Sequence, residues 1–156
     1  MKLAFFGLGA MGKPMSERLI NNGYKLNLFR RKILNNIEQE SYFIDPVEAV
    51  KDCDGLLICI SDDAAVDSVL FGDNGISECL KPNSFVIDFS TISPSKSVSI
   101  HQKLSEKNIF YVDCPVSGGT EGAEKGSLSL FIGASKDECS SFEHIFEVLG
   151  KSINYF

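Results

Sequence analysis

Several patterns that mark particular functions are missing from this sequence. The formal net charge is −6, which argues against nucleic acid as the main partner, because phosphate binding needs an excess or cluster of Lys and Arg. The five cysteines contain no C-x-x-C pair, and their odd number excludes a complete disulfide framework. No stretch reaches the roughly 18 apolar residues that a membrane span needs, and the apolar start is too short for a signal peptide. We therefore expect a cytoplasmic protein with no membrane or nucleic-acid partner.

Apolar runs alternate with helical patterns along the chain. Continuous apolar runs predict strands at residues 3–6, 26–29, 55–60, 85–89 and 109–112, with further strands of undetermined direction at 128–132 and 153–156. Helical spacing predicts helices after residue 12 and at 63–70, 94–107 and 136–149, with a short helical piece around 33–37. This alternation is typical of an α/β fold with a doubly wound, mostly parallel sheet (Rossmann) and helices on both faces. The length of 156 residues predicts one domain spanning 1–156.

A glycine-rich turn directly follows the first predicted strand. Gly7, Gly9 and Gly12 have the G-x-G-x-x-G spacing, which allows a tight turn, close approach to a pyrophosphate, and close packing of helix on strand. A mononucleotide loop is disfavoured, because Pro14 stands where that motif needs a Ser or Thr hydroxyl for magnesium. The predicted dinucleotide site comprises Gly7, Leu8, Gly9, Ala10, Met11 and Gly12.

The end of the second predicted strand indicates which dinucleotide binds. An acidic residue there normally holds the ribose 2′-hydroxyl of NAD, but this strand runs into Arg30, Arg31 and Lys32. Three consecutive cations suit the extra 2′-phosphate of NADP, which a guanidinium grips in two places and a carboxylate would repel. The pattern therefore favours NADP over NAD.

Four segments together resemble the β-hydroxyacid dehydrogenases, the family of 3-hydroxyisobutyrate dehydrogenase. They are FGLGAMGKPM at 6–15, ISDDAAV at 60–66, DFSTISP at 88–94, and DCPVSGG at 113–119 followed by Gly122-Ala123. The resemblance covers the whole chain, which corresponds to the N-terminal NAD(P)-binding domain of that family. It implies that Ile60, Ser61 and Ala65 lie against the cofactor, that Thr91 lies near the nicotinamide ribose, and that Ser117, Gly118 and Gly119 bind a substrate carboxylate. The family commonly has Leu-Pro where this chain has Ile60-Ser61.

No catalytic residue is expected within residues 1–156. In the family the proton donor is a lysine in a G-x-G-x-x-x-K stretch, which we expect beyond residue 156, with the C-terminal helical domain absent from this chain. No Tyr-x-x-x-Lys motif replaces it, and His101 and His144 fall within predicted helices. Asp62 and Asp63 are interpreted as helix-start residues, and no metal site is predicted.

The leading hypothesis is the NADP-binding domain of an NAD(P)-dependent 3-hydroxyacid dehydrogenase or reductase. Its full-length form would transfer hydride between nicotinamide and a small hydroxy acid or semialdehyde, and we expect it to be a homo-oligomer. Two alternatives are a non-catalytic nucleotide-binding or sensing module and a 6-phosphogluconate dehydrogenase-like enzyme. Residues 1–156 alone are expected to bind the cofactor without turnover.

Overall fold

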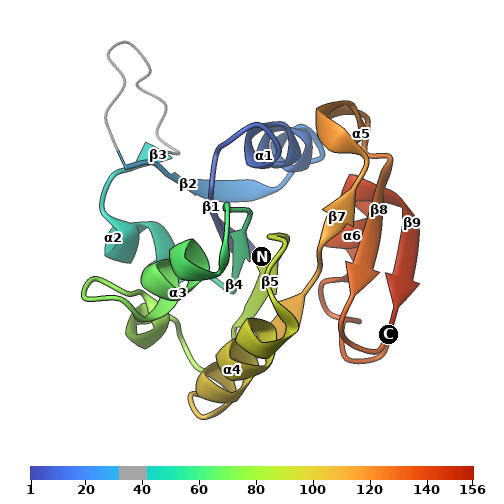
Figure 1. Cartoon of the computed structure of the whole chain (residues 1–156). Coiled ribbons are helices and arrows are strands. Elements are labelled where there is room, and N and C mark those ends of the chain that lie inside the picture. The colour runs from blue at the N-terminus through green and yellow to red at the C-terminus, as the bar shows by residue number, and fades with distance from the viewer. Residues whose placement is uncertain (32–41) are drawn as a thin grey trace.

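A computed structural model describes residues 1–31 and 42–156 (Figure 1). Lys32 and the short helix predicted around 33–37 lie outside the described residues. Six parallel strands form the main sheet in the order β3-β2-β1-β4-β5-β6. These strands are β1 (Lys2–Phe6), β2 (Lys25–Phe29), β3 (Tyr42–Phe43), β4 (Gly55–Ile58), β5 (Phe85–Asp88) and β6 (Phe110–Asp113).

Helices cover both faces of this sheet (Figure 1). In β1, Leu3 and Phe5 pack with α1 (Gly12–Asn21) and α6 (Glu143–Leu149), whereas Ala4 and Phe6 belong to the core on the other face. That second core is closed by α2 (Pro46–Val50), α3 (Asp63–Phe71) and α4 (Pro94–Ser105). Because side chains alternate along a strand, a continuous apolar run supplies both cores. The predicted doubly wound α/β architecture is confirmed.

A second, three-stranded sheet extends the first core. It has the order β7-β8-β9 and consists of β7 (Val116–Ser117), β8 (Leu128–Ile132) and β9 (Gly150–Tyr155), with β7 antiparallel and β9 parallel to β8. Between β7 and β8 lies α5 (Gly119–Lys125), and Arg18 of α1 donates to the backbone carbonyl oxygens of Val148 (2.5 Å) and Glu124 (3.3 Å). Arg18 thereby joins α1 to the segments around α5 and α6.

The helix predicted at 136–149 begins only at Glu143, so its first half was predicted wrongly. Residues 136–142 form successive turns, in which the N–H of Cys139 donates to Lys136 O and the N–H of Phe142 donates to Cys139 O. Phe142 has a φ of −134°, which is not helical, and its buried ring stacks on Phe85 with centroids 4.3 Å apart. Packing of this aromatic ring into the core therefore accompanies a break in the helical spacing.

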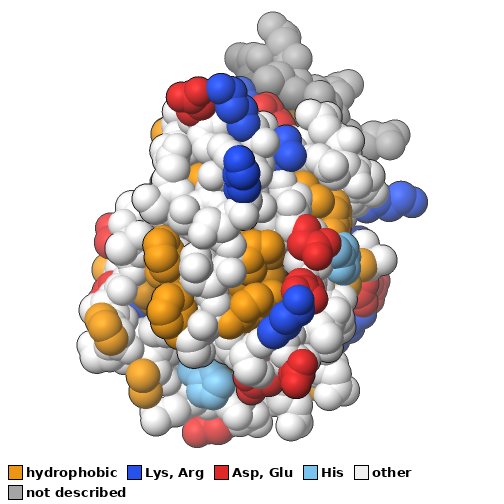
Figure 2. Space-filling view, turned by 90° about the vertical axis from the view of Figure 1, so that its right-hand side faces the viewer, with side chains coloured by type: hydrophobic (Ala, Val, Ile, Leu, Met, Phe, Trp, Pro, Cys, Tyr) orange, Lys and Arg blue, Asp and Glu red, His pale blue; other side chains and the backbone are white. Residues whose placement is uncertain are grey.

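Figure 2 shows the side of the molecule formed by the second sheet, where hydrophobic side chains gather across the middle between charged ones. Phe131 of β8 and Phe156 are 40% and 80% exposed, and their ring centroids lie 6.4 Å apart.

Within residues 1–31 and 42–156, no helix is both long and apolar enough to cross a membrane.

Candidate functional site

Four loops meet at the carboxyl edge of the main sheet, because β2, β1, β4 and β5 are adjacent and parallel. The chain order of the strands reverses between β1 and β4. Ligands of open α/β sheets bind beyond the carboxyl ends of the strands at such a reversal. Most of the residues predicted to bind the cofactor follow these four strands, so the topology brings these separate segments of the sequence to one edge.

Two glycines of the first loop allow its backbone to approach the end of β4. Gly7 has a φ of +101°, and a Cβ there would overlap the carbonyl oxygen of Cys59. A Cβ on Gly12 would overlap the carbonyl oxygen of Gly7. Backbone atoms cannot move aside as the end of a flexible side chain can, so both positions require glycine. The predicted roles of Gly7 in a tight turn and Gly12 in close packing therefore agree with the geometry.

Gly9 differs, because the fold itself does not require a glycine there. A Cβ on Gly9 would meet no atom within 4 Å, and both Gly9 and Ala10 are exposed. The first turn of α1 contains no acidic residue, and its N-cap residue, Met11, makes no side-chain hydrogen bond to it. Amide groups in the first turn of a helix lack partners within the helix and attract anions. This open backbone fits the pyrophosphate of a dinucleotide.

Positive charge lies at the end of β2, next to this loop. The guanidinium carbon of Arg30 lies 4.0 Å from the centroid of the Tyr42 ring, and the backbone N–H of Arg30 donates to Phe43 O at 2.8 Å. Such a cation–π contact holds the planar guanidinium in one orientation. Arg31 is exposed, and Lys32 lies outside the described residues. Arg30 and Arg31 therefore put positive charge directly after the end of β2.

The loops after β4 and β5, together with the first turn of α3, carry the other predicted cofactor contacts. Ser61 and Thr91 are exposed, and Ile60 and Ala65 are half-buried. The backbone N–H of Ile60 donates to Ser90 Oγ at 3.0 Å, which joins the two loops. The hydroxyl groups of Ser61 and Thr91 are thus displayed on loops that are hydrogen-bonded to each other.

A buried acid at the end of β5 supports this edge. Asp88 is 0% exposed, and its carboxylate accepts hydrogen bonds from Ser90 N (2.9 Å) and Tyr111 Oη (3.1 Å). Burial raises the pKa of Asp88 to about 6, and these hydrogen bonds act in the opposite direction. Ser90 is the residue whose Oγ accepts from Ile60, so Asp88 joins β5 and β6 to the loop after β4. Sequence reasoning missed this role, although an Asp ending a buried apolar run was a visible signal.

The predicted carboxylate-binding segment lies between β7 and α5. Ser117 ends β7, Gly118 is the N-cap of α5, and Gly119 is the first residue of that helix. The two glycines have φ values of +137° and +64°, a region that disfavours other residues. All three residues are exposed, and a Cβ on Gly119 would meet no atom within 4 Å. The segment is therefore a defined turn into a helix, and its contact with a substrate stays a prediction.

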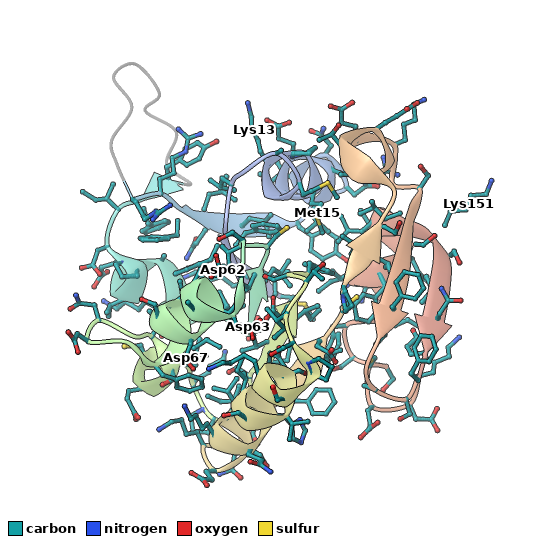
Figure 3. All side chains as sticks on the ribbon, in the orientation of Figure 1. Lys13, Met15, Asp62, Asp63, Asp67 and Lys151 are labelled. Atoms are coloured by element: carbon teal, nitrogen blue, oxygen red, sulfur yellow. The ribbon has the colours of Figure 1, made fainter. Side chains whose placement is uncertain are left out.

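The two adjacent acids at the start of α3 have different partners (Figure 3). Asp62 caps the helix by accepting from Ala65 N at 2.9 Å, as the helix-start interpretation predicted. Asp63 instead accepts from Ser93 N at 2.8 Å and from Ser93 Oγ, which belongs to the loop after β5. Sequence spacing gave no signal for this second contact.

The two histidines, Lys151 and a surface hollow lie outside these four loops. His101 and His144 are exposed, and Lys151 is an exposed residue of β9 (Figure 3). A hollow of about 360 Å³ lies between the C-terminal ends of α3 and α4, where Lys107 is paired with Glu78. Among the residues that the structure describes, no group of three or more His, Cys, Asp or Glu side chains could hold a metal ion.

Comparison with known protein families shows to which family this chain belongs. The sequence pattern described as the NAD binding domain of 6-phosphogluconate dehydrogenase matches residues 2–156. The chain belongs to this family. The predicted resemblance to the N-terminal domain of β-hydroxyacid dehydrogenases is likewise confirmed, and the chain is an NAD-binding domain of that group.

Named relatives agree with this assignment. The chain is 33% identical to 2-(hydroxymethyl)glutarate dehydrogenase of Eubacterium barkeri, with 98% of this chain and 52% of that protein covered. It is 30% identical to the mitochondrial 3-hydroxyisobutyrate dehydrogenase of Mus musculus, with 98% and 47% covered. A solved structure, Psf3 in complex with NADP+ and 2-OPP, superposes with a TM-score of 0.85 at 25% identity, covering 99% of this chain and 55% of that one. The chain thus spans about half the length of these relatives.

Substitution by alanine separates the two kinds of glycine in the loop of this NAD-binding domain. Gly12→Ala should lower the free energy of unfolding by about 1–3 kcal/mol or more, because the new methyl group would overlap the backbone carbonyl oxygen of Gly7. Gly9→Ala should change it by less than about 0.5 kcal/mol, because the site is open to solvent. Denaturant unfolding measures both values. Equal destabilisation by the two substitutions would contradict the assignment.

Asp88→Asn tests the buried acid through the pH dependence of stability. A pKa raised to about 6 in the folded state means that the neutral form stabilises the fold below about pH 4, and that this contribution is lost as the pH rises through 6. The free energy of unfolding of the unaltered chain should therefore fall, relative to Asp88→Asn, by about 2–3 kcal/mol from pH 4 to pH 7. Denaturant unfolding at several pH values provides the measurement, and parallel curves would show that Asp88 is not responsible.

Proposed function

We propose that this chain is the NADP-binding domain of a β-hydroxyacid dehydrogenase that interconverts a small hydroxy acid and the corresponding semialdehyde. The observation that carries the proposal is the loop from Gly7 to Gly12 at the point where the strand order reverses. Gly7 and Gly12 are required by close packing, whereas Gly9 leaves backbone open beside the start of α1. An open backbone at this position suits a pyrophosphate.

The 2′-phosphate preference rests on Arg30 and Arg31. Arg30 is held over the Tyr42 ring, so its planar guanidinium is pre-oriented and loses little freedom on binding a phosphate. No carboxylate stands in the run Phe29-Arg30-Arg31 to hold a free ribose 2′-hydroxyl. The Psf3 complex with NADP+ adds support from a relative of the same fold.

The exposed turn at Ser117, Gly118 and Gly119 supports the proposed substrate class. A hydroxyl followed by two residues without Cβ presents donors to an anion at short range, which suits a carboxylate. The names of the relatives, 2-(hydroxymethyl)glutarate dehydrogenase and 3-hydroxyisobutyrate dehydrogenase, refer to small hydroxy acids. We infer that this turn holds the substrate acid while Ser61 and Thr91 hold the cofactor.

Nicotinamide, when bound, supplies or accepts the hydride. The chain's own loops would orient it by their hydroxyl and backbone groups, since the carboxyl edge brings Gly9, Ser61 and Thr91 to one side of the sheet. A proton must accompany the hydride, and we propose that a lysine outside residues 1–156 donates it. The exposed His101 and His144 are not proposed for this role.

Arg30→Asp tests the cofactor preference. The affinity for NADPH should fall by about 10- to 100-fold, because the guanidinium proposed to bind the 2′-phosphate is replaced by a carboxylate that repels it. The affinity for NADH should change by less than about threefold, since no 2′-phosphate is involved. Fluorescence titration of both dinucleotides measures the effect.

Lys25→Asp is the matched control for this substitution, because Lys25 is an exposed cation at the opposite end of the same strand. It should leave both affinities unchanged. Tighter binding of NADH than of NADPH by the unaltered chain would refute the NADP assignment.

Turnover separates binding from catalysis. Residues 1–156 should bind NADPH yet oxidise it negligibly in the presence of small aldehydes, because they contain no proposed proton donor. Absorbance of the reduced nicotinamide follows the reaction, and titration of the same sample checks that binding occurs. Robust turnover would mean that the proton donor lies within these residues.

A further inference from the structure

The loops after β4 and β5 are joined by a second contact beyond the Ile60–Ser90 hydrogen bond. Asp63 is the first residue of α3, and Ser93 directly precedes α4. The Asp63 carboxylate accepts from Ser93 N at 2.8 Å through one oxygen and from Ser93 Oγ through the other. One side chain therefore receives two hydrogen bonds from the neighbouring loop.

The backbone of the sheet does not set the spacing of these loops on its own. The last paired residues of β4 and β5 are Ile58 and Asp88, followed by a hydrogen bond from Phe89 N to Ile58 O at 2.7 Å. Past this point, regular strand pairing ends, and the distance between the loops depends on side-chain contacts. Ser61 and Thr91, the exposed candidates for cofactor binding, both lie in this region.

Helix capping does not account for the Asp63 contact. The start of α3 is capped by Asp62, which accepts from Ala65 N at 2.9 Å. The start of α4 is capped by Ser93, whose Oγ accepts from Lys96 N at 3.4 Å. Each helix therefore has its own N-cap residue. The Asp63 contact has a different role, because it connects the start of α3 to the start of α4.

The Asp63 carboxylate is suited to this connection. Hydrogen bonds from the Ser93 side chain and backbone lower the pKa of Asp63, so the carboxylate is ionised near neutral pH. Hydrogen bonds to an ionised acceptor are about twice as strong as those between neutral groups.

We propose that Asp63 is a positioning residue that sets the distance between the loop of Ser61 and the loop of Thr91. This inference rests on the proposed function, in which the cofactor spans both loops. The affinity of a ligand that touches both loops should depend on Asp63. The affinity of a ligand limited to the adenosine end of the cofactor site should not. Asp63 itself is not assigned any contact with the cofactor.

A matched control lies one turn further along the same helix (Figure 3). Asp67 also links α3 to α4, by accepting from Lys96 Nζ at 2.9 Å and pairing with Lys103 at 3.9 Å. This link lies further from the carboxyl edge than Asp63 does, because α3 runs from that edge toward the other. Removing it tests the joining of the helices without altering the two loops.

The experiment measures the binding of NADPH and of adenosine 2′,5′-bisphosphate, which lacks the nicotinamide half, to the 156-residue chain. Asp63→Ala should weaken NADPH about tenfold and the bisphosphate less than about twofold, as expected for the loss of hydrogen bonds to a charged group. Asp63→Asn keeps an acceptor for Ser93 N and should recover part of the NADPH affinity. Asp67→Ala should leave both affinities unchanged.

Several outcomes would overturn the inference. Equal weakening of both ligands by Asp63→Ala would indicate a general loss of structure, and no weakening of either would remove the role altogether. If circular dichroism shows that Asp63→Ala is unfolded, the Asp63→Asn variant decides, by weakening NADPH more than the bisphosphate or by failing to. If the unaltered chain binds neither ligand, the proposed function fails and the inference with it; normal NADPH binding by both Asp63 variants defeats the inference alone.

Discussion

The close approach of two backbone segments at the centre of the sheet underlies the whole candidate site. The turn after β1 lies so near the end of β4 that a side chain on Gly7 would overlap the carbonyl oxygen of Cys59. Gly12 in turn lets the start of α1 lie against Gly7. Since β1 and β4 are the strands between which the chain order reverses, this contact directs the start of α1 toward the carboxyl edge. Gly9 lies between these two enclosed glycines, and its own backbone is open.

Polar contacts beyond the strand ends complete the edge. Asp88 is buried beneath it and holds Ser90, which receives the N–H of Ile60. Burying an acid is costly, as its raised pKa shows, and the hydrogen bonds from Ser90 and Tyr111 offset part of that cost. Asp63 adds a second connection at the surface. Asp88 of β5, Tyr111 of β6 and Asp63 of α3 thus act together on loops that are far apart in the sequence.

Much of the fold was predictable because its signals are local. Apolar runs such as 55–60 predicted central strands, since a strand covered on both faces has few polar residues. The helix expected at 136–149 was wrong in its first half, because burial of Phe142 against Phe85 overrides the spacing of apolar residues there. The three-stranded sheet was expected only as two strands of undetermined direction. Pairing between β7, β8 and β9 depends on contacts that no local pattern specifies.

The sequence by itself determined the glycine loop, the cations at Arg30 and Arg31, and membership among the NAD-binding domains. These follow from residue types at short spacing, where local geometry permits few alternatives. Only the tertiary structure decided which atoms enclose two of these glycines: the carbonyl oxygen of Cys59 for Gly7, and the carbonyl oxygen of Gly7 for Gly12. It also decided that Asp63 reaches Ser93 while its neighbour Asp62 caps a helix. The physical reason is that Asp63 and Ser93, or Gly7 and Cys59, are thirty or more positions apart in the sequence, and only the folded sheet brings such segments together.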